Sequence, residues 1–275
     1  MAATHAQAGQ AIKGWPSSKE RQAHSRRRVQ FIRMTKRDAD SVSRSGHPND
    51  VASSSLGRSG AVQIPVGDVS LAGDLEFPAD AAGLVLFAHG SGSSRHSPRN
   101  QHVARVLRAA GSGTLLFDLL TREEEAEDAY SGHLRFDIAF LAERLVAASR
   151  WLTSQSVAQY LPLGYFGSST GAGAALTAAA LLGSAIRAVV SRGGRPDLAM
   201  EALPHVTAAT LLIVGERDEV VLRLNEEAFA RLAVEKSLAV VPGATHLFEE
   251  PGALEAVARL AAHWFERHWK ERPAG

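Results

Sequence analysis

Ser169, Asp218 and His246 have the residue types, and the order along the chain, that nucleophilic catalysis by a serine requires. A serine hydroxyl is a poor nucleophile at neutral pH and needs a base beside it. Histidine usually serves as that base, and a carboxylate orients it and stabilises the imidazolium. We therefore predict that Ser169 attacks a carbonyl carbon, that His246 takes the serine proton, and that Asp218 accepts a hydrogen bond from His246 Nδ1.

The setting of Ser169 distinguishes it from an ordinary loop serine. An apolar run at 163–166 precedes Gly167-Ser168-Ser169-Thr170-Gly171, and small helix-forming residues follow. The Gly-x-Ser-x-Gly pattern is typical of a tight strand-to-helix turn with the serine exposed at its tip. Glycine is needed on both sides because a Cβ atom there would collide with neighbouring backbone. A purely structural turn is the alternative, and the downstream acid and histidine favour a nucleophile.

Two aspartates compete for the role of the orienting acid. Asp218 follows the apolar segment 211–214, and Asp197 follows the apolar segment before it. We favour Asp218, because the orienting acid is expected directly after that later strand. Glu216 and Glu219 are nearby but less well placed.

His246 is the histidine best placed to act as the base. It follows the last predicted strand, in Gly243-Ala244-Thr245-His246, where a loop can reach over the sheet. An ordinary surface histidine is the alternative. His263 and His268 fall in the last predicted helix, and we expect them at the surface.

The tetrahedral intermediate also needs two hydrogen-bond donors directed at its oxyanion. We expect one to be the backbone N–H of Thr170, directly after the nucleophile, and the other to be the N–H of Ser91. Ser91 follows His89-Gly90, where the glycine lets the backbone approach a substrate. A glycine-rich loop after a strand can instead bind phosphate. No Gly-Lys-Ser/Thr follows here, and the Gly-x-Ser-x-Gly motif favours the oxyanion site.

The composition excludes several classes of site. The chain has 275 residues, of which 45% are hydrophobic and 21% charged, as in an ordinary soluble globular protein. It has no cysteine, which excludes disulfides, thiolate metal sites and a cysteine nucleophile. We see no run of about 18 apolar residues. We therefore expect a cytoplasmic protein that works without a metal or cofactor.

The charge is unevenly distributed along the chain. Residues 1–60 hold eleven Lys or Arg against four Asp or Glu, whereas the remaining residues hold nineteen against twenty-five. We predict two regions: a basic, disordered extension over 1–58 and a folded domain over 59–272. Arg26-Arg27-Arg28 could contact an anionic surface, but a solvated tail fits better. A transit peptide, or translation from Met34, is another interpretation.

In the folded part, apolar segments alternate with amphipathic ones. This alternation predicts an α/β fold with a mostly parallel sheet, helices on both faces and the functional site at the carboxyl ends of the strands. The short segment 191–210 leaves room for a minimal lid or none. An acidic stretch at 123–128 is expected to be a solvated loop. The predicted strands are 61–66, 69–77, 83–88, 114–117, 163–166, 186–191, 210–214 and 237–241, and the predicted helices are 100–110, 136–152, 170–182, 224–234 and 253–268.

These motifs together resemble the α/β-hydrolase superfamily. The order Gly-Ser-Ser-Thr-Gly, Gly-Glu-Arg-Asp and Gly-Ala-Thr-His carries that resemblance. The segments 89–100, 191–197 and 245–251 are similar to a bacterial dienelactone-hydrolase-like branch, whose members are sometimes fused to a phosphoribosyltransferase domain. The resemblance covers about residues 61–270 and implies an eight-stranded sheet. Dienelactone hydrolases proper use a cysteine nucleophile, so the serine here separates the family name from the substrate.

Arginines beside the expected site are candidates for substrate binding. Arg192 and Arg195 follow the strand next to the Ser169 turn, and a guanidinium binds carboxylate or phosphate with two parallel hydrogen bonds. The alternative is that these arginines pair with acidic residues such as Asp197 and brace the loops.

The sequence therefore predicts a serine hydrolase that cleaves small carboxylic esters or lactones through an acyl-enzyme. An acyltransferase or thioesterase on the same fold is the first alternative, and a non-catalytic partner-binding member is the second. We expect a monomer or homodimer that binds no specific nucleic acid.

Overall fold

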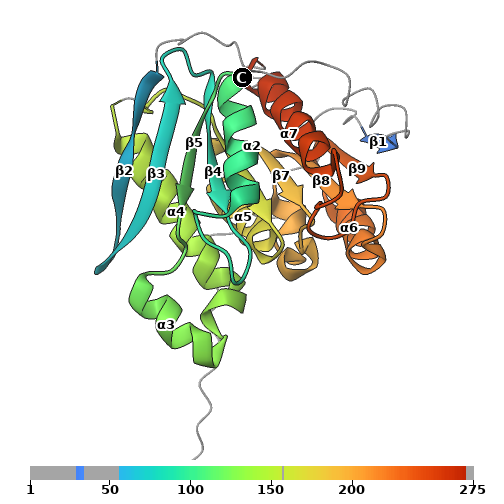
Figure 1. Ribbon diagram of the computed structural model, residues 1–275, viewed down its shortest axis with the longest axis horizontal. Coiled ribbons are helices and arrows are strands. Elements are labelled where there is room, and N and C mark those ends of the chain that lie inside the picture. The colour runs from blue at the N-terminus through green and yellow to red at the C-terminus, as the bar shows by residue number, and fades with distance from the viewer. Residues whose placement is uncertain (1–28, 34–55, 157, 271–275) are drawn as a thin grey trace, which may run out of the picture.

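The computed structural model describes residues 29–33, 56–156 and 158–270, and the side chains from residue 59 onwards within those ranges. Its strands form one sheet in the order β1-β9-β8-β7-β6-β4-β5-β3-β2 (Figure 1). The pairs from β5 through β4, β6, β7 and β8 to β9 are parallel, and β3 and β2 are added antiparallel at one edge. The strands from β2 to β9 therefore make the mostly parallel, eight-stranded sheet that the sequence predicts.

The central strands are mostly apolar because both of their faces are covered. Every residue of β4, β5 and β6 is buried. The strand bounds are β2 Leu56–Val66, β3 Val69–Pro78, β4 Gly83–Ala88, β5 Ser112–Phe117, β6 Leu163–Ser168, β7 Ile186–Arg192, β8 Ala209–Gly215 and β9 Lys236–Val241.

Helices cover the sheet on both faces, as predicted. Helices α2 and α7 pack on one face around a cluster that includes Phe87 and Phe166, while α4, α5 and α6 pack on the other face around Tyr165 (Figure 1). The helix bounds are α2 Pro98–Ala109, α3 Arg122–Ser131, α4 Ile138–Ser154, α5 Thr170–Leu182, α6 Glu219–Arg231 and α7 Ala253–Lys270. None of the described helices is long and apolar enough to cross a membrane.

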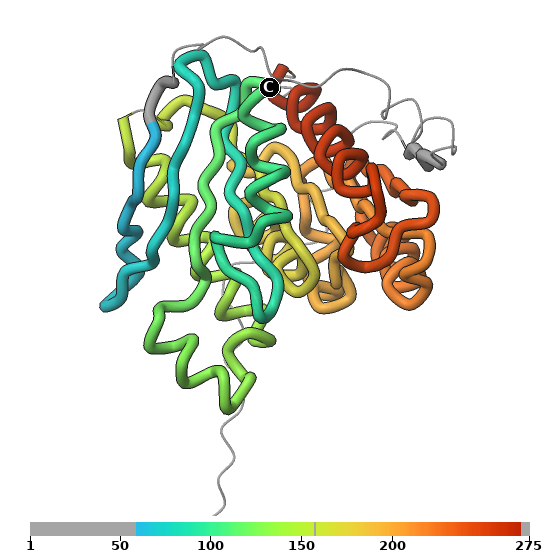
Figure 2. Tube along the Cα trace, viewed as in Figure 1, coloured from blue at the N-terminus to red at the C-terminus, as the bar shows by residue number. Residues whose placement is uncertain are grey.

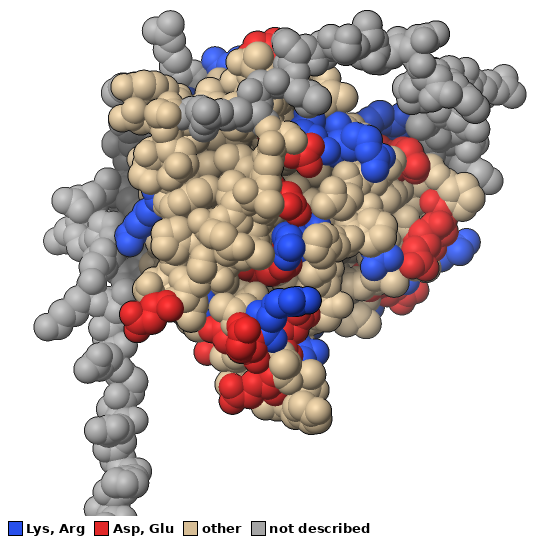
Figure 3. Space-filling view, turned by 60° about the vertical axis from the view of Figure 1, so that its left-hand side comes forward, with Lys and Arg blue, Asp and Glu red and all other residues tan. Residues whose placement is uncertain are grey.

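The acidic stretch 123–128 is not a loop but part of α3, so that prediction is wrong. Thr121 caps the helix, its side chain accepting from the Glu124 N–H while the Glu124 carboxylate accepts from the Thr121 N–H. This reciprocal pair begins a helix despite the local charge repulsion. The exposure was predicted correctly, because most side chains of this stretch are exposed. Figure 2 shows that α3 protrudes from the rest of the fold, and Figure 3 shows acidic side chains gathered on that protruding part. Asp128 is the exception and is fully buried.

Two further details differ from the sequence prediction. His268 is buried rather than at the surface, and its Nδ1 lies 2.6 Å from the Trp264 carbonyl oxygen. A short strand, β1 at Val29–Arg33, pairs in parallel with β9 and lies inside the 1–58 extension, where no strand was expected. The rest of that extension up to residue 55 lies outside the described residues.

Candidate active site

Ser169 lies at the turn between β6 and α5 in a backbone conformation that side chains rarely adopt. Its φ is 50° and its ψ is −124°. A non-glycine residue in this region is strained, and such strain is typical of functional sites. The packing explains the flanking glycines, because a Cβ at Gly167 would lie 2.5 Å from Ala172 Cα and one at Gly171 would lie 2.2 Å from the Ala88 carbonyl oxygen. The turn therefore holds Ser169 partly exposed at the end of the sheet.

His246 and Asp218 are brought together across 28 positions of sequence. A 2.6 Å hydrogen bond joins His246 Nδ1 to Asp218 Oδ2. An ionised carboxylate can only accept, so His246 donates from Nδ1 and Nε2 is left able to take a proton. The Asp218 side chain is 13% exposed and that of His246 is 39% exposed, so the pair is shielded on the acid side and open on the histidine side.

The histidine loop packs against the serine turn through Arg192 and Gly193. The Ser169 N–H donates to the Arg192 carbonyl oxygen at 3.3 Å. The next residue, Gly193, has a φ of 50°, and a Cβ there would lie 3.1 Å from the His246 carbonyl oxygen. These contacts bring His246 to the same edge of the sheet as Ser169.

The competing acid, Asp197, is engaged elsewhere. It lies in the 3₁₀ helix η5, Pro196–Ala199, and receives hydrogen bonds from Arg195 Nε at 2.8 Å and Arg195 Nη2 at 2.7 Å. The two side chains form a bidentate ion pair beside the site, which is the bracing arrangement that the sequence left open. Glu216 also turns away, because its carboxylate accepts the Gly243 N–H at 2.8 Å.

Among the described residues, Arg192 has no acidic partner of this kind. Only 8% of the residue is exposed, and its Nε and Nη1 atoms make no hydrogen bond within the described part of the chain. Burial lowers the pKa of its guanidinium to about 10, and the charge of Arg99 acts in the same direction. Arg99 itself pairs with Glu249 at 3.2 Å.

The two expected oxyanion donors lie side by side. Thr170 is the first residue of α5, so its backbone N–H has no carbonyl partner within the helix and lies at the positive end of the helix dipole. The Ser91 N–H donates to Thr170 Oγ1 at 2.9 Å and is therefore not free in this structure. Gly90 fits tightly here, since a Cβ on it would lie 3.0 Å from Ser169 Cβ.

His89 holds this loop in place through both nitrogens of its ring. The Leu119 N–H donates to Nε2 at 3.1 Å, and Nδ1 lies 3.1 Å from the Gly90 carbonyl oxygen. Since Nε2 accepts, the hydrogen sits on Nδ1 and is donated to Gly90. Burial lowers the pKa of His89 below its usual value, which keeps the ring neutral. The sequence motif identified the loop but not this function of its histidine.

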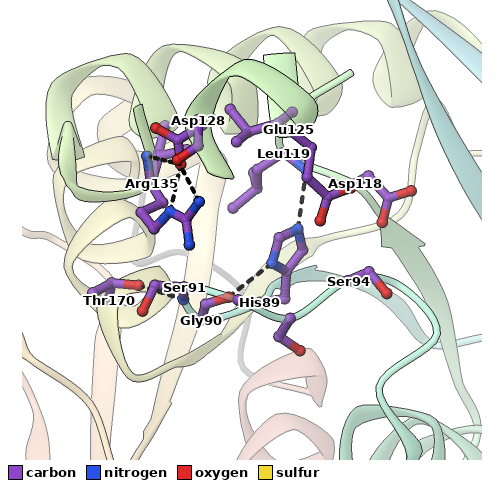
Figure 4. A pocket seen from close by; sticks show the side chains of 14 residues that line it. His89, Gly90, Ser91, Ser94, Asp118, Leu119, Glu125, Asp128, Arg135 and Thr170 are labelled. Atoms are coloured by element: carbon purple, nitrogen blue, oxygen red, sulfur yellow. Dashed lines mark hydrogen bonds and ion pairs between the residues drawn. The ribbon is translucent and has the colours of Figure 1, made fainter. Parts of the chain in front are cut away.

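A pocket opens beside these donors, and Figure 4 shows its lining. Its walls come from the His89–Ser94 loop, the start of α5, the segment after β5 and the α3 region. Arg135 projects into it from the short 3₁₀ helix η3, Leu134–Phe136, toward Ser91 and Thr170 (Figure 4). No sequence pattern indicated a role for Arg135, because its position depends on how the chain folds back after α3.

Arg135 is fixed by the buried Asp128. Arg135 Nε donates to Asp128 Oδ2 and Arg135 Nη2 donates to the Asp128 carbonyl oxygen, both at 2.5 Å. The Leu134 N–H donates to Asp128 Oδ1 at 2.6 Å. Burial alone would raise the pKa of Asp128, but the hydrogen bonds from Arg135 and the Leu134 N–H hold it below its usual value. The described residues contain no group of three or more side chains suited to bind a metal ion.

Comparison with solved structures finds a similar protein with the same fold. A crystal structure of dienelactone hydrolase from Anabaena variabilis is 59% identical to this chain, with a TM-score of 0.76, and the match covers 77% of this chain and 98% of that one. Est1E from Butyrivibrio proteoclasticus is 16% identical with a TM-score of 0.62, covering 75% of this chain and 99% of that one. The dienelactone hydrolase-like phosphotriesterase P91 from metagenomic libraries is 18% identical with a TM-score of 0.63, covering 77% and 98%. The last two likenesses concern the fold alone.

Among curated proteins, the chain is 59% identical over 207 residues to proteins of two Mycobacterium tuberculosis strains that are provisionally named phosphoribosyl transferases. The match covers 75% of this chain and 46% of those proteins, so the chain spans about half the length of the curated relatives it matches. No family model matches the sequence.

Proposed function

Since the chain belongs to the dienelactone-hydrolase-like branch of the α/β-hydrolase superfamily, we propose that it hydrolyses small carboxylic esters or lactones through a covalent acyl-enzyme. The observation that carries this proposal is the 2.6 Å bond from His246 Nδ1 to Asp218. It orients a basic Nε2 at the edge of the sheet where the strained Ser169 turn presents a hydroxyl.

The proposed reaction proceeds in two halves. Ser169 Oγ forms a bond to the ester carbonyl carbon while His246 Nε2 takes the serine proton, and the carbonyl π electrons move onto oxygen. The oxyanion is held where Thr170 and Ser91 meet. Its collapse breaks the bond to the alcohol oxygen, which leaves with the proton from His246. Water then attacks the acyl-enzyme in the same way and releases the acid and Ser169.

The pocket lined by Ser91, Thr170 and Arg135 is the proposed place for the substrate. Arg135 Nη1 makes no hydrogen bond within the described residues, whereas its Nε and Nη2 are held by Asp128. A guanidinium fixed in this way favours a substrate with a hydrogen-bond acceptor near the scissile carbonyl. The sequence assigned substrate binding to Arg192 and Arg195, but Arg195 is paired with Asp197 and neither lines this pocket.

Acyl transfer to an alcohol or thiol is the alternative on the same residues. It differs only in the acceptor that attacks the acyl-enzyme, so adding such acceptors to the assay separates the two reactions. The transferase name of the curated relatives concerns proteins about twice as long as the matched segment. Chemistry at an acyl carbon, rather than phosphoribosyl transfer, is supported by the arrangement of Ser169, His246 and Asp218.

Turnover of a panel of p-nitrophenyl esters and lactones tests the proposal. Ser169→Ala should lower kcat by about 10³-fold or more, because no other group can form the acyl-enzyme. Ser168→Ala is the matched control, because Ser168 Oγ is buried and donates to Asn100 Oδ1 at 3.2 Å on the other side of the turn. If Ser168→Ala abolished turnover while Ser169→Ala did not, the nucleophile would be misassigned.

A further inference from the structure

A hydrogen bond between Ser91 and Thr170 occupies one of the two N–H groups expected to hold the oxyanion. The Ser91 N–H donates to Thr170 Oγ1 at 2.9 Å, joining two loops that are 79 positions apart in sequence. A substrate oxyanion that took this N–H directly would have to displace the threonine hydroxyl. Because the Thr170 side chain is nearly fully buried and β-branched, it is confined to few rotamers, which makes that displacement unfavourable.

The threonine hydroxyl has a hydrogen of its own to donate. A hydroxyl can accept and donate at once, so Oγ1 that accepts from Ser91 still carries one O–H hydrogen. No acceptor for that hydrogen is found within the described part of the chain. Thr170 lines the pocket together with Gly90 and Ser91, and Figure 4 shows its side chain beside Ser91. The hydrogen is therefore available to a group bound in the pocket.

We infer that Thr170 is a catalytic residue that donates twice to the oxyanion, through its backbone N–H and through its hydroxyl. This inference rests on the proposed function. The Ser91 N–H acts through the hydroxyl, since an accepted hydrogen bond polarises an O–H and strengthens its donation. Both donors belong to the residue next to Ser169, so they are fixed relative to the nucleophile, and the N-terminus of α5 adds a partial positive charge.

Two substitutions at Thr170, to valine and to serine, distinguish donation by the threonine hydroxyl from direct donation by the Ser91 N–H. Valine keeps the shape and removes the hydroxyl, whereas serine keeps the hydroxyl. We expect Thr170→Val to lower kcat on p-nitrophenyl acetate by about 10²- to 10³-fold, the usual loss for one oxyanion donor, with KM little changed. Thr170→Ser should stay within about tenfold of wild type. Thermal melting of both variants shows whether valine has disturbed the fold.

A tetrahedral-adduct inhibitor gives a second readout that a structural defect would not imitate. A trifluoromethyl ketone adds to a catalytic serine and presents an oxyanion, so Thr170→Val should weaken its binding by a factor similar to the loss in kcat, and Thr170→Ser should not. Wild-type kcat and inhibitor affinity in Thr170→Val would overturn the inference and return the role to the freed Ser91 N–H. A wild-type chain without turnover, or an active Ser169→Ala, would instead overturn the proposed function and this role with it.

Discussion

Replacing Asp218 by asparagine tests the acid more sharply than any other change at the site. The substitution keeps the shape of the side chain and replaces one carboxylate oxygen with an NH₂ group. In place of the 2.6 Å bond that His246 Nδ1 donates, the amide can donate to Nδ1. That exchange favours the tautomer with hydrogen on Nε2, which can no longer take the Ser169 proton.

The expected loss follows from this change of tautomer. In a serine protease the corresponding substitution costs about 10⁴-fold in kcat, which at about 1.4 kcal/mol per factor of ten is roughly 5.5 kcal/mol of transition-state stabilisation. The melting temperature of Asp218→Asn should stay close to that of wild type, because the side chain is isosteric and remains hydrogen-bonded. Initial rates with p-nitrophenyl acetate and a calorimetric scan measure the two effects.

Asp197→Asn is the matched control. Asp197 lies next to the same sheet edge but accepts from Arg195, whose side chain is 39% exposed. The Asp197 side chain is 16% exposed, so the ion pair is only partly open to solvent. Such a pair contributes on the order of 1 kcal/mol to stability, so this variant should lose little activity and at most a few degrees of melting temperature. Asp218 is not the orienting acid if Asp197→Asn loses more activity than Asp218→Asn, or if the two variants lose the same amount.

Three further predictions concern the surroundings of the site. Burial lowers the pKa of His89, so as the pH falls below the usual value of 6.5 the unfolded chain binds a proton at His89 before the folded chain does. The melting temperature should therefore fall as the pH is lowered below 6.5, and His89→Gln should show a smaller dependence of melting temperature on pH. An unchanged pH dependence in His89→Gln would contradict this prediction. Arg135→Met should raise KM about tenfold for esters that carry a carboxylate and leave KM for p-nitrophenyl acetate unchanged, with Arg195→Met as the control. An equal rise in KM for both kinds of ester would mean that Arg135 only braces the pocket. Deleting residues 1–28 should leave the melting temperature unchanged, whereas deleting residues 1–55 should lower it, because the longer deletion removes the pairing of β1 with β9. Equal melting temperatures for the two deletions would show that β1 adds no stability.

Most of the fold could be predicted from the sequence because its signals are local. Continuous apolar runs fix the buried strands, and α5 begins and ends where the composition places it. Helix α3 was missed because its acidic residues carry almost no amphipathic pattern. What holds α3 is a capping pair at Thr121 and an ion pair from Glu124 to Arg144 on α4, and the second contact depends on the tertiary structure.

The candidate site likewise has residues whose position the sequence predicts and residues whose position depends on tertiary contacts. Ser169, Asp218 and His246 follow strand ends, and parallel strands bring their carboxyl ends to one edge. The sequence therefore suffices to predict that these three residues lie at the same edge of the sheet. Arg135 follows no strand, and its hydrogen bonds to the buried Asp128 hold it at the pocket. The bond from the Ser91 N–H to Thr170 Oγ1 is a side-chain contact that backbone patterns do not encode.

The most direct test of the central claim is to locate a covalent adduct after treating the protein with a fluorophosphonate, which reacts with activated serine hydroxyls. Mass spectrometry of the digested protein should find one adduct, on Ser169, and none in the Ser169→Ala variant. Asp218→Asn should be labelled far more slowly than wild type, because His246 no longer activates the hydroxyl. An unlabelled wild-type protein, or an adduct on Ser168 that persists in Ser169→Ala, would contradict the account.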